Sequence, residues 1–128
     1  MLENLRSLLL GPRVDPPPGI DVDSLPAGIV FRSGRLVPRL GGVLSRLGGP
    51  AAAVTLGRTI VINPEARLTR SLLAHELAHV RQWEQDRLFP IRYSLATFRH
   101  GYHDNPYEVE ARHFAAAEQP SSQGEDQA

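Results

Sequence analysis

Two histidines four residues apart, His75 and His79, constrain this chain more than any other feature of its sequence. Residues four apart lie on one face of an α-helix, about one turn from each other, so both imidazoles can reach a single metal ion. Thr69 and Ser71 are both suitable N-caps for such a helix, which is predicted to continue to about Asp86. Its apolar side is supplied at helical spacing by Leu72, Leu73, Leu77, Val80 and Trp83.

Glu76 follows the first histidine and completes the pattern His-Glu-x-x-His. One position on from His75, it is expected at the flank of the histidine face, where its carboxylate can approach a water on the metal. Zinc lowers the pKa of bound water to about 7, so a nearby carboxylate can accept the proton and pass it to a leaving amine. Glu76 is therefore the predicted general base. The alternative is a solvated helix face that carries His and Glu for ion pairs.

Catalytic zinc sites normally have three protein ligands, so a third ligand must come from another segment. The chain has no cysteine, which leaves His, Asp and Glu as the strong ligands available. Spacing alone does not choose among the candidates, which are His100, His103, Asp104, Glu108, Glu110 and His113.

The 128 residues suit one domain with a single core. Fourteen arginines balance fourteen acidic residues, so the zero formal charge disfavours a nucleic-acid partner. No segment approaches the roughly 20 apolar residues of a membrane span, and residues 1–10 predict a short amphipathic helix rather than a secretory signal. A cytoplasmic location is expected, with export by a specialised system left open.

The remaining segments predict a small antiparallel sheet and further helices, an α+β fold. We expect three regions: an N-terminal helix with a Pro-rich lead-in (1–27), the domain proper (28–118) and a disordered tail (119–128). The predicted strands are 29–31, 53–55 and 59–62, with turns at Gly41-Gly42 and Gly48-Gly49-Pro50 and a short helical turn at 43–47. Helices are predicted at 91–100 and 106–118, and the aromatic residues expected in the core are Trp83, Phe89, Tyr93, Phe98 and Phe114.

The segment from Ser71 to Trp83, preceded by Ala53 to Ile60, resembles the minimal gluzincin zinc peptidases. The likeness is strongest to metallopeptidase-like core domains associated with extracellular contractile injection systems. In those domains a strand leads into a helix bearing the histidines and then Val-x-Gln, which here is Val80-Arg81-Gln82. The resemblance covers about residues 53 to 115. It implies a zincin-like domain with a small sheet beside the active-site helix and a glutamate-bearing helix packed against that helix.

The same resemblance implies a third ligand in a Glu-x-x-Ala pattern, which Glu108-Val109-Glu110-Ala111 supplies. It therefore favours Glu108 over Glu110, with zinc as the metal. Arg112 departs from the family, because Asp or Asn often stands there to support the first histidine. No histidine falls between His79 and His100, which argues against the families that use a third histidine.

The implied activity is hydrolysis of a peptide or protein substrate. Tyr102, His103 and Tyr107 lie just before the proposed ligand in the sequence and are candidates to stabilise the oxyanion. The strand at 59–62 is a candidate edge for main-chain recognition of an extended peptide. Two other functions compete: a non-catalytic zinc-binding interaction module, and a toxin-like accessory domain of a secretion or injection system.

Overall fold

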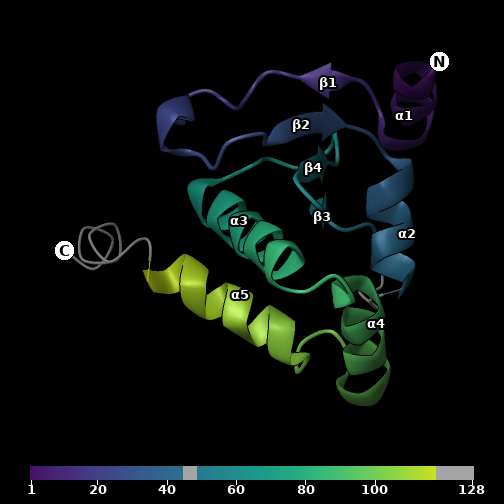
Figure 1. Cartoon of the computed structure of the whole chain (residues 1–128), viewed down its shortest axis with the longest axis vertical. Coiled ribbons are helices and arrows are strands. Elements are labelled where there is room, and N and C mark those ends of the chain that lie inside the picture. The colour runs from purple at the N-terminus through teal and green to yellow at the C-terminus, as the bar shows by residue number, and fades with distance from the viewer. Residues whose placement is uncertain (45–48, 118–128) are drawn as a thin grey trace. The chain divides into compact units, whose positions relative to one another are not determined.

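The computed structural model describes residues 1–44 and 49–117 of the chain (Figure 1). They belong to two compact units, Met1–Leu68 and Thr69–Ala128. Within the described ranges, five α-helices and four strands make a small α+β fold, as predicted. None of these helices has the length and apolar character needed to cross a membrane. The predicted tail at 119–128 and most of the helical turn predicted at 43–47 lie outside the described residues.

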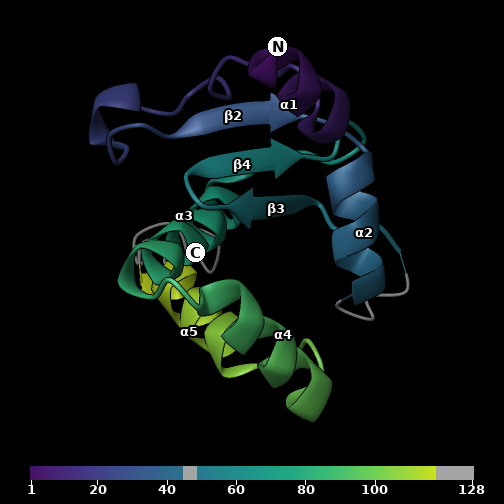
Figure 2. The same cartoon turned by 45° about the vertical axis from the view of Figure 1, so that its right-hand side comes forward.

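The first unit contains a four-stranded mixed sheet in the order β1-β2-β4-β3. Its strands are β1 (Arg13–Val14), β2 (Val30–Ser33), β3 (Ala53–Leu56) and β4 (Thr59–Ile62). β1 and β2 are antiparallel. β3 and β4 are also antiparallel, but β2 and β4 are parallel, as the arrows of these three strands show (Figure 2). The sheet is thus mixed rather than wholly antiparallel. Parallel neighbours need a long crossover, and here α2 and β3 lie between β2 and β4 in the chain.

β4 lies inside the sheet, so the prediction that residues 59–62 offer a free edge is wrong. β2 pairs with it on one side and β3 on the other. Ile60 and Val61 on successive positions of β4 are both fully buried. Successive residues of a strand point to opposite faces, so both faces are covered, as expected for a β-branched central strand.

α2 (Leu36–Leu44) replaces the turn predicted at Gly41-Gly42. Pro38 is tolerated because it lies in the first helical turn, where backbone N–H groups lack intrahelical partners. Neither glycine forms a turn. The absence of a side chain at each position instead allows a neighbouring segment to lie close to the helix. A Cβ on Gly41 would lie 2.8 Å from Cγ2 of Val54, and one on Gly42 would lie 2.0 Å from the carbonyl oxygen of Gly49.

The N-terminal helix is present as α1 (Leu2–Leu10), and a buried arginine connects it to the sheet. Arg32 on β2 has 2% of its surface exposed. Its Nη1 donates to the carbonyl of Gly11 at 2.9 Å and its Nη2 to Oε1 of Glu3 at 2.8 Å. A buried guanidinium without such partners would be costly, so α1 and the following turn satisfy it. A short 3₁₀ helix, Val22–Ser24, lies between β1 and β2.

The second unit is helical and consists of α3 (Arg70–Gln85), α4 (Phe89–His100) and α5 (Pro106–Ala117). α3 and α5 make the most extensive helix contact of the unit and run side by side in Figure 1. Thr69 caps α3, because its Oγ1 accepts from the backbone N–H of Leu72 at 3.1 Å. α4 begins two residues earlier than predicted, with Pro90 in its first turn.

One aromatic residue of α4 departs from the predicted core. Phe89 is buried, but Phe98 is 76% exposed. These two positions are nine residues apart, which places them on opposite sides of a helix with 3.6 residues per turn. The side of α4 that carries Phe89 packs within the unit, and the other side remains exposed.

Candidate metal centre

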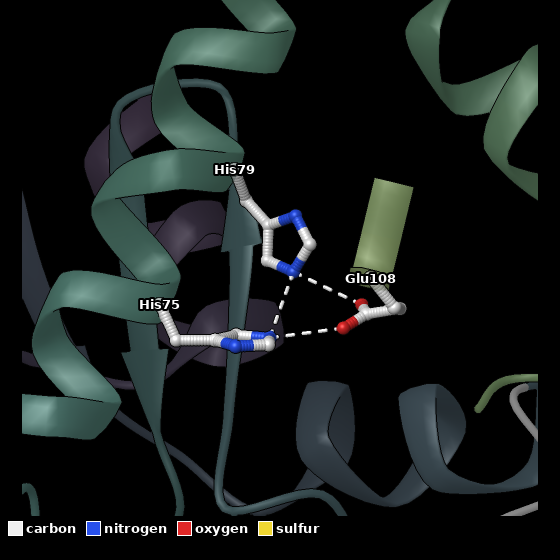
Figure 3. A group of neighbouring side chains, drawn as sticks. All are labelled: His75, His79 and Glu108. Atoms are coloured by element: carbon white, nitrogen blue, oxygen red, sulfur yellow. Dashed lines mark hydrogen bonds and ion pairs between the residues drawn. The ribbon is translucent and has the colours of Figure 1, made fainter. Parts of the chain in front are cut away.

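Three donor residues from two helices converge in the second unit. His75 and His79 project from the middle of α3, and Glu108 projects from the first turn of α5 (Figure 3). The Nε2 atoms of the two histidines are 3.2 Å apart. Oε2 of Glu108 lies 2.9 Å from Nε2 of His75, and Oε1 lies 3.0 Å from Nε2 of His79. The structure therefore brings the two helix-borne histidines together with Glu108.

The spacing of these donors suits one metal ion. Candidate ligand atoms of the three residues all lie within 4.8 Å of one another. A tetrahedral ion with bonds of 2.0–2.1 Å spaces its ligand atoms about 3.3 Å apart, close to the 3.2 Å between the two Nε2 atoms, and Glu108 presents one carboxylate oxygen to each histidine. The Glu108 side chain is 3% exposed and those of His75 and His79 are 15% and 10% exposed. The group can therefore hold a metal ion, and both nitrogens needed for it already face the carboxylate.

The charges of the site are strongly coupled. Burial disfavours the charged form of His79, but hydrogen bonding and charge attraction from Glu108, helped by Glu76 and Gln82, outweigh it and raise its pKa to about 9. Burial likewise disfavours the Glu108 carboxylate, yet its interactions with His75 and His79 hold the pKa of Glu108 well below the ordinary value. Glu108 is thus an anion at neutral pH, as a metal ligand must be.

Gln82 connects His79 to α5. Its Oε1 lies 2.8 Å from Nδ1 of His79, the ring nitrogen that faces away from Glu108. Its Nε2 donates to the carbonyl of Tyr107 at 2.9 Å and to Oε1 of Glu110 at 3.2 Å. Gln82 is 3% exposed, so this amide is buried with a partner at each end.

One face of α4 supports the start of α5. Residues four apart on this face are Phe89, Tyr93 and Thr97. The Phe89 ring packs edge-to-face on Tyr107, with centroids 5.1 Å apart. The Tyr93 hydroxyl donates to Oε1 of Glu108 at 2.8 Å. Thr97 accepts from Nδ2 of the fully buried Asn105 at 2.9 Å.

Asn105 precedes α5 as an N-cap, since its Oδ1 accepts from the backbone N–H of Tyr107 at 2.9 Å. Pro106 then occupies the first helical position, where no N–H is required. The cap fixes where α5 begins. It thereby places Glu108 in the first turn, within reach of α3.

The predicted general base and oxyanion candidates occupy different surroundings. Glu76 is buried, and its charge contributes to the raised pKa of His79. Burial, followed by charge and hydrogen bonding from Glu108, raises the pKa of Tyr102 above its ordinary value of 10.0. The Tyr107 ring packs on Phe89 and Tyr93. His103 is exposed, and its backbone carbonyl accepts from Arg112.

The other candidate ligands do not join the group. Glu110 is exposed and contacts Gln82 instead of the histidines. The side chains of four more are exposed, namely His100, His103, Asp104 and His113. The contact of Tyr93 with Glu108 was not anticipated, because its sequence position suggested only core packing. The spacing of Phe89, Tyr93 and Thr97 on one helix face is the signal that could have indicated it.

Residues 45–87 match the family model of the eCIS core domain. The matched segment includes β3, β4 and α3, and therefore the pattern from His75 to His79. It spans 43 of the 128 residues and ends before α4 and α5, so Tyr93 and Glu108 lie beyond it. The match supports a domain similar to the eCIS core domain in this part of the chain. No curated protein and no solved structure matches the chain.

Proposed function

We propose that this chain is a zinc-dependent metallopeptidase domain that hydrolyses peptide bonds of a peptide or protein substrate. The observation that carries the proposal is the convergence of His75, His79 and Glu108 into one group of possible metal ligands. The ligand-bearing helix also carries Glu76 directly after the first histidine. A purely structural metal site has no need of that carboxylate.

The donor set supports zinc in a catalytic rather than a structural arrangement. Catalytic zinc sites have three protein ligands, whereas structural sites have four. Among the residues that the structure describes, the group consists of three residues, two histidines and one glutamate. When bound in such a site, zinc acidifies water and polarises a carbonyl group.

Glu76 and Tyr102 are proposed to act beside the metal ligands. Glu76 would accept a proton from the attacking water and deliver it to the leaving amine. Tyr102 is proposed to donate a hydrogen bond to the oxyanion. The support for this role is its place beside the site, because the Tyr102 hydroxyl interacts with the proposed ligand Glu108. Tyr107, whose ring contacts Phe89 and Tyr93, and the exposed His103 have weaker support as donors.

The proposal is tested by metal analysis of the purified protein and a peptide-library cleavage assay. The analysis should cover zinc and iron, because two histidines and a carboxylate also suit iron. We expect Glu76→Gln to retain one metal ion per chain and to lose roughly 10²- to 10⁴-fold in cleavage rate. Glu84→Gln, an exposed position on the same helix, is the matched control and should cleave as the unaltered chain does. Equal cleavage by Glu76→Gln would refute the proposed base.

A second function is favoured by the family match. The similarity to the eCIS core domain supports an accessory domain of an injection system, in which a bound metal would serve folding or docking. The two functions give different results in the same experiment. One metal ion per chain without cleavage dependent on Glu76 would favour the accessory domain.

A further inference from the structure

The orientation of the buried Gln82 amide is set by α5. Its Nε2 faces two oxygens of α5, the backbone carbonyl of Tyr107 and the carboxylate of Glu110. A carbonyl and a carboxylate can only accept hydrogen bonds, whereas an amide presents a donor at one end and an acceptor at the other. Reversing the amide would place its oxygen against two acceptors. The NH₂ end must therefore face α5.

This orientation determines which nitrogen of His79 carries a hydrogen. With its NH₂ end toward α5, Gln82 presents Oε1 to Nδ1 of His79 at 2.8 Å. Because Oε1 can only accept, Nδ1 must be the donor. A histidine that binds a metal is neutral and has one N–H, so with that hydrogen on Nδ1 the lone pair for the metal is on Nε2. Nε2 is the atom that faces His75 and Glu108 at 3.2 Å and 3.0 Å.

We infer that Gln82 is a positioning residue, oriented by Tyr107 and Glu110 of α5, that fixes His79 in the tautomer and rotation needed to bind metal through Nε2. The inference rests on the metal-binding part of the proposed function. It means that metal binding by His79 on α3 depends on α5, the helix that also supplies the third ligand. It also gives Glu110 a role as an orienting acceptor.

The expected loss of zinc affinity follows from the burial of the Gln82 side chain, which connects His79 to α5. Hydrogen-bond partners behind a metal-binding histidine typically change metal affinity by 10- to 100-fold when removed. Gln82→Met keeps a side chain of similar length but removes both the acceptor for His79 and the donor to α5. We expect its zinc dissociation constant to rise by roughly 10- to 100-fold. Glu110→Ala removes one of two acceptors, and that one is exposed, so a rise of roughly two- to fivefold is expected.

The experiment measures zinc affinity of the full chain by competition with a chromophoric chelator, together with ¹⁵N NMR of His79 in the zinc-loaded protein. Gln85→Met, an exposed glutamine at the end of α3, is the matched control and should bind zinc with unchanged affinity. In the unaltered chain we expect zinc on Nε2 and a slowly exchanging hydrogen on Nδ1. A residue with a merely structural role would not alter the exchange of that hydrogen, whereas Gln82→Met should accelerate it.

Unchanged zinc affinity in a folded Gln82→Met variant would overturn the inference, as would zinc on Nδ1 of His79 in the unaltered chain. If Gln82→Met does not fold, the Glu110→Ala variant tests the inference instead. Unchanged affinity together with unchanged exchange of the Gln82 amide hydrogens in that variant would also overturn it. Zinc binding without peptide cleavage would remove the peptidase proposal and leave this inference standing. Failure of the unaltered chain to bind zinc would remove both.

Discussion

The coupling between His79 and Glu108 predicts an unusual pH dependence of stability in chelator-treated protein. The pKa of His79 is raised from 6.5 to about 9 in the folded chain. The folded state therefore holds one more proton than the unfolded state between these values. The stabilisation is fully present below pH 6.5, decreases as the pH rises, and is lost above about pH 9.

The magnitude follows from the shift. One pKa unit corresponds to 1.36 kcal/mol, so a shift of about 2.5 units corresponds to about 3 kcal/mol of unfolding free energy. Between pH 7 and pH 8.5 the slope from this group should approach about −1.4 kcal/mol per pH unit. That is a large share of the stability of a small domain.

Urea denaturation at several pH values in the presence of a chelator measures this slope, and NMR titration of the His79 ring measures its pKa directly. Glu108→Gln removes the carboxylate that stabilises the proton on His79. Most of the slope of unfolding free energy against pH should therefore be lost. Glu110→Gln, on the same helix, should retain it. The reasoning is refuted if His79 titrates near 6.5 in the unaltered chain, or if Glu108→Gln and the unaltered chain show equal slopes.

Three further changes test the surroundings of the site. Glu108→Ala should lose most bound zinc in equilibrium dialysis, whereas Glu110→Ala should retain close to one ion per chain. Tyr93→Phe removes the hydroxyl that donates to Glu108. It should lower the unfolding free energy at pH 7 by about 2 kcal/mol, measured by urea denaturation with chelator, and an unchanged value would contradict that contact. Asn105→Ala removes the cap of α5 and leaves buried partners unsatisfied, so it should cost about 2–4 kcal/mol in the same assay, and a loss below about 0.5 kcal/mol would contradict this role.

The elements that were predictable are those whose signals are local. A Thr cap before apolar residues at helical spacing located α3, and Asn105-Pro106 located the start of α5. β3 and β4 likewise followed from short runs of β-branched and apolar residues. His75, His79 and Glu108 came from a local pattern and a family resemblance, and the structure places them within reach of one ion.

The features that were missed depend on contacts between distant segments. Gly41 and Gly42 predict a turn when only the local sequence is considered. In the structure both lie in a helix, where neighbouring segments come too close to leave room for a side chain. The parallel pairing of β2 with β4 depends on a crossover that periodicity does not encode. Tyr93 contacts Glu108 across 15 residues of sequence. The local spacing in α4 indicates that Tyr93 shares a helix face with Phe89 and Thr97, but it does not indicate that this face meets Glu108.

The separation of the ligands along the chain has one more consequence. His79 and Glu108 are 29 residues apart, so an ion between them would act as a reversible cross-link that closes the loop containing α4. Each opening of α5 away from α3 would then require release of the ion. In hydrogen-exchange measurements, removing the metal should deprotect amides of α3 and α5 while leaving those of β2, β3 and β4 unchanged.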